Sequence, residues 1–159
     1  MRVFLAACVA CATVGTADAQ SCAAPQPLPQ GGSTSADTCV GIREADTLCA
    51  GAFDNPGPNT VFSFFLSVPY HGEFQLASHT IGFVPVMYLS SSAEPCDIAA
   101  CVASGGIGTP LPVDGLAVGA YRLIVGAASD APSGSCGVFT LSYDLTAQEP
   151  IFADGFDAS

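Results

Sequence analysis

Hydrophobic and polar residues alternate along much of the chain in its second half. In the first such run every second residue is apolar (Phe62, Phe64, Leu66 and Val68), and serines lie between them. A period of two residues predicts a strand with one buried side. Phe65 has the opposite parity, so it is expected on the same face of the strand as the serines. We therefore expect an aromatic side chain on the exposed face of this strand, where it is a candidate for binding.

A second alternating run follows after a short connection. Phe74 and Leu76 alternate with polar or small residues, and only Pro69–Gly72 separates them from the first run. A connection of this length between two strands is typical of a hairpin. We therefore predict that the two strands pair with each other.

Three later segments continue the strand pattern. Val84–Leu89 is apolar at both parities, which predicts a central strand covered on both faces, with Pro85 near its beginning. The other two segments each place apolar residues on one parity, and these are Tyr121, Leu123, Val125, Phe139, Leu141, Tyr143 and Leu145. Helical periodicity over ten residues is absent after residue 20. We predict an all-β fold, an antiparallel two-sheet β-sandwich whose sheets bury these faces against each other.

The N-terminal segment has the composition of a secretory signal. Arg2 precedes an apolar stretch, Val3–Val14, and small residues stand at Ala17 and Ala19. This order predicts cleavage between Ala19 and Gln20 and a secreted protein, extracellular or periplasmic. A membrane anchor needs about 20 consecutive apolar residues. No stretch of that length is present, so we expect no membrane span.

The sequence beyond the signal divides into three parts. Residues 20–36 are rich in Pro, Gln, Gly and Ser, which predicts a flexible leader tied down only at Cys22. Residues 37–147 carry the strand pattern and are expected to form the β-sandwich domain. Residues 148–159 are interpreted as a linker and a C-terminal tail.

Acidic residues dominate the charge of the chain. Fourteen Asp and Glu against three Lys and Arg give a formal net charge of −11. Removal of the signal takes away one base and one acid, and the remaining bases are Arg43 and Arg122. Such a charge repels phosphate backbones and anionic lipid, which argues against nucleic acid and acidic membranes as partners. The partner is expected to be an extracellular or periplasmic protein or a polysaccharide.

Six cysteines remain after the signal, and an even number in an exported chain predicts disulfides. They are Cys22, Cys39, Cys49, Cys96, Cys101 and Cys136. Fifteen pairings are possible. Close spacing favours Cys96 with Cys101 and Cys39 with Cys49, and elimination then pairs Cys22 with Cys136.

The two histidines of the chain are poorly placed for catalysis or for binding one metal ion together. His71 and His79 stand at the two ends of a predicted strand, about 27 Å apart at about 3.4 Å per residue. One ion cannot contact both rings. The alternative to a binding module is a small secreted hydrolase in which His79 acts with Asp97 or Asp130 and a loop serine. The main prediction is that the chain is not an enzyme and has neither catalytic residues nor a cofactor.

Calcium is the one metal that the sequence suggests. Asp54, Asn55 and Asn59 bring side-chain oxygens together within six residues, and calcium binds six to eight oxygens. Three further acids would lie nearby if Cys39 and Cys49 were joined, and these are Asp37, Glu44 and Asp46. The alternative interpretation is a tight turn in which the Asp and Asn side chains cap their own backbone.

Four stretches together resemble the bacterial pre-peptidase C-terminal domain. They are Asp54–Leu66 (DNPGPNTVFSFFL), Phe83–Leu89 (FVPVMYL), Leu116–Val125 (LAVGAYRLIV) and Cys136–Leu141 (CGVFTL), within a match that covers about Asp37–Thr146. The resemblance implies a jelly-roll-like, non-catalytic sandwich of the kind attached to secreted peptidases and other exported enzymes. It favours a secreted binding or accessory module, or alternatively a chaperone or inhibitor of a separately encoded secreted peptidase.

The C-terminal sequence resembles a short tail found on exported proteins of some Gram-negative bacteria. It reads Ile151–Asp157 (IFADGFD). The resemblance implies an export or sorting tag in which Phe152 and Phe156 make hydrophobic contacts. The alternatives are a loose terminus or an extra strand that docks its aromatic residues on the domain.

Overall fold

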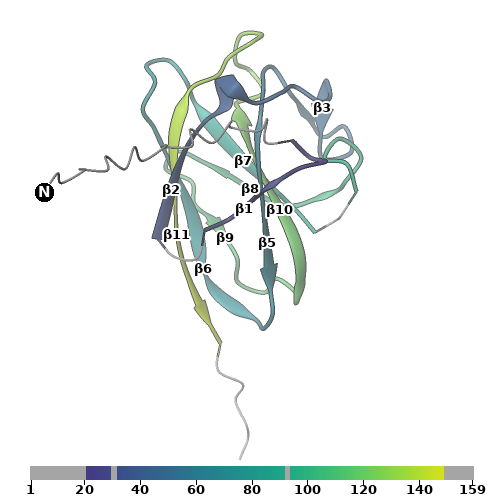
Figure 1. Ribbon diagram of the computed structural model, residues 1–159, viewed down its shortest axis with the longest axis vertical. Helices are drawn as coiled ribbons and strands as arrows, with labels where there is room; N and C mark the ends of the chain where they lie inside the picture. Colours follow the sequence, from purple (N-terminus) through teal and green to yellow (C-terminus); the bar gives the residue numbers. More distant parts are fainter. Residues whose placement is uncertain (1–20, 30–31, 92–93, 149–159) are drawn as a thin grey trace, which may run out of the picture.

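The computed structural model describes residues 21–29, 32–91 and 94–148, which form a β-sandwich (Figure 1). The predicted signal peptide and the C-terminal tail lie outside these residues. Within them, no helix has the length and apolar composition needed to cross a membrane. The elements in chain order are β1 (Gln26–Pro27), β2 (Gly32–Asp37), the 3-10 helix η1 (Thr38–Val40), β3 (Thr47–Leu48), β4 (Phe53–Asp54), β5 (Thr60–Leu66), β6 (Tyr70–Ser78), β7 (Pro85–Ser90), β8 (Cys101–Gly106), β9 (Leu111–Pro112), β10 (Gly119–Ala127) and β11 (Val138–Ala147).

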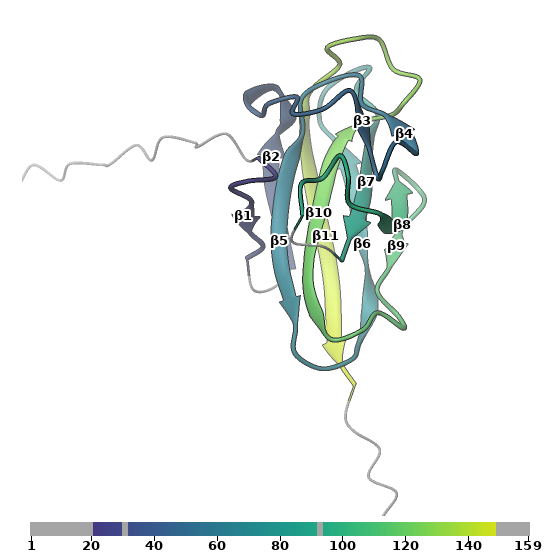
Figure 2. The same ribbon diagram turned by 90° about the vertical axis from the view of Figure 1, so that its right-hand side faces the viewer.

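Two sheets pack face to face, which confirms the predicted fold class. One has five strands in the order β1-β5-β10-β7-β8, and the other has four in the order β2-β11-β6-β9. Figure 2 shows the two layers from the side. The alternating apolar residues meet between them, where Phe62 and Leu123 face Phe74 and Leu141, and all four are fully buried. Their burial provides the main driving force for the two layers to associate.

The outer face of the five-stranded sheet carries a second, smaller core. Val61, Tyr88 and Ile124 point to this side and pack with Leu48 of β3 and with three of the cysteines. Strand β7 is therefore a central strand that is covered on both faces and begins at Pro85, as predicted, and its neighbours are β10 and β8.

The predicted hairpin between β5 and β6 is wrong. The two strands lie in different sheets, and the connection between them crosses from one layer to the other (Figure 2). β5 pairs with β10, whereas β6 pairs with β11 over nine residues. Each strand has one apolar face, and the crossing allows these faces to bury each other across the sandwich instead of lying side by side.

The predicted flexible leader is also wrong, because it contributes a strand to each sheet. β1 runs parallel to β5, and Leu28 N–H donates to Ser63 O at 2.8 Å. β2 pairs antiparallel with β11 over six residues, and Ser35 Oγ lies 2.9 Å from Thr140 Oγ1. The sandwich domain therefore begins well before residue 37. Backbone hydrogen bonds at a sheet edge require little apolar sequence, which explains the absence of a hydrophobic pattern here.

The described residues contain three disulfides, but none of the predicted pairs. The bonds are Cys22–Cys96, Cys39–Cys136 and Cys49–Cys101, with Cα–Cα distances of 5.7, 4.9 and 4.9 Å. Each joins segments that are far apart in sequence, not the ends of a short loop. They tie the leader to the β7–β8 loop, η1 to the loop before β11, and the residue after β3 to the first residue of β8. Irregular segments are thereby fixed to the sheets.

Candidate functional site

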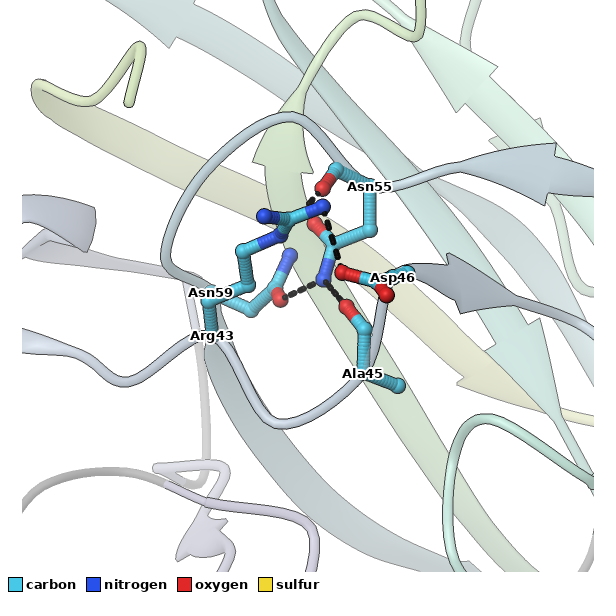
Figure 3. A network of polar contacts seen from close by, with 5 residues as sticks. All are labelled: Arg43, Ala45, Asp46, Asn55 and Asn59. Atoms are coloured by element: carbon cyan, nitrogen blue, oxygen red, sulfur yellow. Dashed lines mark hydrogen bonds and ion pairs between the residues drawn. The ribbon is translucent and has the colours of Figure 1, made fainter. Parts of the chain in front are cut away.

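The three calcium candidates do not form a ligand set. Asn55 and Asn59 are buried, but Asp54 is exposed on β4. The Asn55 side-chain amide donates to Asn59 Oδ1 at 2.9 Å and to Ala45 O at 2.8 Å (Figure 3). A hydrogen-bond donor therefore lies between the oxygens that the sequence suggested for a cation. The described residues contain no group of three or more His, Cys, Asp or Glu arranged to hold a metal ion.

This polar network instead fixes the turn before β5. Arg43 Nε donates to Asn55 O at 2.7 Å, and Arg43 Nη2 lies 2.9 Å from Asp46 Oδ1 (Figure 3). Asn55 N–H donates to Asp46 O at 2.8 Å. These contacts join the loop before β3 to the turn that begins at Asn55. The turn interpretation of Asn55 and Asn59 therefore describes their role better than the calcium hypothesis does.

The structure does not assemble the triad expected around His79. His79 Nε2 lies 2.7 Å from Thr140 Oγ1 on the outer face of the four-stranded sheet. Asp97 lies in the β7–β8 loop and Asp130 in the β10–β11 loop. Within the described parts of the chain, neither carboxylate contacts His79, so no acid orients its ring as catalysis by a triad requires.

His71 takes part in a contact at the other end of β6. Its Nδ1 lies 3.0 Å from Asp114 Oδ1, and the same oxygen accepts a hydrogen bond from Gly72 N–H at 3.1 Å. The Gly72 hydrogen bond, followed by the His71 contact, lowers the pKa of Asp114 from its usual value of 3.8. This carboxylate therefore remains ionised at a lower pH than an isolated aspartate does.

We expect a carbon-detected NMR titration of Asp114 to give a midpoint below 3.8, because both donors favour the ionised form. The folded state then gains stability above the usual aspartate pKa and loses it as the pH falls through the lowered pKa. In the His71→Ala variant the midpoint should rise only part of the way, since the Gly72 hydrogen bond remains. A midpoint at or above the usual value in the native protein would contradict this assignment.

A groove runs along one lateral edge of the sandwich, between the two sheets. It encloses about 670 Å³. Its walls come from the leader, from β5 and the turn after it, and from the end of β11. The lining residues are Pro27, Leu28, Pro29, Gly32, Ser63, Phe64, Phe65, Leu66, Ser67, Tyr70, Tyr143, Asp144 and Leu145. A hollow of this size, lined by both aromatic and polar residues, is a candidate binding site.

Aromatic packing supports the floor of this groove. Phe74 is fully buried, with its ring centroid 5.4 Å from Phe64 and 5.8 Å from Tyr143. Phe64 in turn stacks on Tyr121 at 5.6 Å. The Tyr143 hydroxyl donates to Pro29 O, and burial raises the pKa of the Tyr143 phenol. The floor thus connects both sheets and the leader through rings with few rotatable bonds.

The lining of the groove includes one carboxylate, Asp144, and one exposed aromatic ring. Phe65 is 65% exposed, as the parity of its strand predicted. Asp144 lies directly opposite Glu73 in the β6–β11 ladder, and no Lys or Arg is among the described residues that line the groove. Arg122 does not line this groove, but it lines a neighbouring hollow together with Phe65, and it donates to Glu94 O.

Sequence reasoning identified only part of this lining. Phe65 was found because an aromatic residue stands among serines on the exposed parity. Tyr70 and Tyr143 were missed, because one follows a proline in a connection and the other has the parity of a core residue. Their position beside the groove depends on how the leader packs against the two sheets, which the hydrophobic pattern does not indicate.

Comparison with known proteins shows a likeness in fold. No family model and no curated protein matches the sequence. Among solved structures, the chain is similar to the crystal structure of Aeromonas hydrophila PliG, a periplasmic lysozyme inhibitor of g-type lysozyme. The TM-score is 0.52, with 7% sequence identity, over 76% of this chain and 95% of that chain. At this identity the likeness concerns the fold alone. The resemblance to the pre-peptidase C-terminal domain stays a prediction.

Proposed function

We propose that this chain is a secreted, non-catalytic protein that binds and inhibits a secreted enzyme, and that a g-type lysozyme is the first enzyme to test. The observation that carries the proposal is the fold, which corresponds to nearly the whole length of a periplasmic lysozyme inhibitor. Three disulfides support an exported location. The groove offers a surface that a protein partner can contact.

The charge of the chain indicates the character of the partner surface. The net charge is −11, and both arginines of the described residues already have acceptors, Asp46 for Arg43 and Glu94 O for Arg122. An acidic surface of this kind accelerates encounter with a basic one. We infer that the inhibited enzyme presents a basic surface beside its substrate cleft.

The test is a lysis assay in which the purified secreted protein is added to a g-type lysozyme that clears a peptidoglycan suspension. The clearing rate should fall in proportion to the added protein and level off at one equivalent. The association rate should fall about tenfold or more between 0.01 and 0.15 M salt, because the screening length shortens from about 30 to about 8 Å.

Reduced and alkylated protein provides the control, since it keeps the carboxylates but not the disulfide-bonded fold. An unchanged clearing rate at a hundredfold molar excess of folded protein would refute inhibition of this enzyme class. Inhibition of a secreted peptidase in a parallel assay, without any effect on the lysozyme, would favour the alternative partner class instead.

A further inference from the structure

The edge of β5 is only partly covered. β1 pairs with β5 at Phe62 and Ser63 alone, and the last contact is the hydrogen bond from Leu28 N–H to Ser63 O. Among the described strands, none pairs with Phe64–Leu66 on this side, although β10 pairs with them on the other. Within the described residues, the end of β5 therefore has no paired strand on this side.

The backbone of Phe65 faces this open edge. Along a strand, the N–H and C=O groups of successive residues point to opposite sides. Since Ser63 O points toward β1, the N–H and C=O of Phe65, two residues later, point the same way. The Phe65 side chain is also exposed. Phe65 thus combines an available donor, an available acceptor and an apolar surface.

The opposite wall of the groove is formed by the end of β11. β2 pairs with β11 as far as Tyr143. The groove lies between the end of β5 and the end of β11 and is lined by Leu28, Tyr70 and Leu145. An extended chain placed in it would find backbone partners on one wall and apolar contacts on the other.

Proteins normally protect such edges against pairing with another chain. The usual devices are lysine, proline, bulges or a covering loop. Here the open edge carries the sequence Phe64–Leu66, and the whole chain contains no lysine. An apolar edge that itself carries neither lysine nor proline, beside a preformed groove, fits the recognition mode in which a peptide adds a strand to a sheet.

We infer that the groove binds an extended, cationic segment of the partner, which adds as a strand to the open edge of β5 at Phe65. The inference rests on the proposed function for the identity of the partner, but its chemistry comes from the groove itself. Alternate apolar side chains of the segment would enter the groove. Lys or Arg side chains would lie beside Asp144, which lines the groove.

Charge favours this occupant over two others that are available. The chain's own residues 149–159 include Glu149, Asp154 and Asp157 and contain no Lys or Arg. A second copy of the chain brings another net charge of −11. Both would place like charge near Asp144, which lines the groove. A cationic segment from another protein meets the opposite charge.

Hydrogen exchange at the Phe65 amide tests the inference directly. The probe is a blocked eight-residue peptide of alternating Val and Lys, added to the full secreted chain at 0.15 M salt. Saturating peptide should slow exchange at the Phe65 amide at least tenfold. The fully N-methylated peptide has the same charge and keeps its carbonyl groups, but its N-methyl groups prevent close pairing with a strand edge, and it should give no such protection. Equal protection by both peptides, or protection by neither, would overturn the inference.

Two substitutions at one position separate the backbone from the side chain. Phe65→Ala removes the ring and should weaken peptide binding a few-fold. Phe65→Pro also removes the N–H, which faces the open edge and makes no ladder hydrogen bond within the sheet. We expect it to weaken binding at least tenfold relative to Phe65→Ala. Equal affinities of two folded variants would show that β5 does not accept a strand.

The remaining outcomes identify a different occupant. If removal of residues 149–159 speeds exchange at Phe65 in the absence of peptide, the tail occupies the edge and the inference is wrong. Protection that grows with protein concentration would show a second copy there. Failure of lysozyme inhibition alone leaves the peptide result intact, whereas a Phe65→Pro protein that still inhibits would place the inhibitory surface elsewhere.

Discussion

Replacement of both Cys39 and Cys136 by alanine is expected to lower the free energy of unfolding by about 4 to 5 kcal/mol. The disulfide joins residues separated by 97 positions, and the entropy lost by the unfolded chain grows with the length of the closed loop. It also holds a buried contact in place. Thr38 N–H donates to Gly137 O at 3.1 Å, and Gly137 N–H donates to Thr38 Oγ1 at 2.9 Å. The total free energy of unfolding of a small domain is only about 5 to 15 kcal/mol, so this loss is large.

Urea denaturation followed by near-ultraviolet circular dichroism measures the change. The matched control replaces Cys49 and Cys101, which are separated by 52 positions, and should lose about 4 kcal/mol in the same chain-entropy model. A Cys39 and Cys136 variant within about 1 kcal/mol of the native protein would contradict the expectation. Mass spectrometry of disulfide-linked peptides should first recover the Cys39–Cys136 bond and not a bond from Cys22 to Cys136.

The core was predictable from the sequence because a strand with one buried face places apolar residues at every second position. Phe62, Phe74, Leu123 and Leu141 stand at alternate positions and all lie between the two sheets. The same pattern does not indicate which strands are neighbours. An apolar face on β5 and another on β6 are compatible with a hairpin and with a crossing between layers. The choice depends on contacts with β10 and β11, which follow much later in the chain.

The leader and the disulfides were not predictable because their partners are distant. β2 is held mainly through the backbone of β11, and its sequence, GSTSAD, carries no hydrophobic signal. The cysteine spacing suggested local loops, yet the shortest of the three bonds spans 52 positions. Short spacing shows only that a bond is geometrically allowed. Three-dimensional packing decides which cysteine lies opposite.

In the candidate site, too, features set by neighbouring residues were predictable, and features set by residues far apart in sequence were not. Asn55 and Asn59 were interpreted as oxygen ligands, but an asparagine side chain is also a donor, and Asn55 donates to Asn59. Phe65 was identified from parity alone. The groove beside it depends on how β1 packs against β5 and β2 against β11. Neither pairing follows from any pattern in the sequence.

Replacement of Phe74 by alanine is expected to lower the free energy of unfolding by about 3 to 5 kcal/mol, because the ring is fully buried and its removal leaves a cavity. The ring also supports the groove from below. Phe64 and Tyr143 lie against it with centroid distances of 5.4 and 5.8 Å, and both line the groove. We therefore expect affinity for the alternating Val and Lys peptide to fall at least tenfold under conditions in which the variant is folded.

Phe139→Ala is the matched control for this second effect. Phe139 is equally buried in the same core, but its aromatic neighbour is Phe62 at 6.4 Å, and neither residue lines the groove. Both variants should lose similar stability in urea denaturation, since each removes one buried phenyl ring. Only Phe74→Ala should lower the affinity for the peptide more than threefold. If both variants lower the affinity equally, the affinity depends on the general stability of the domain, and the Phe74 contacts have no specific role in shaping the groove.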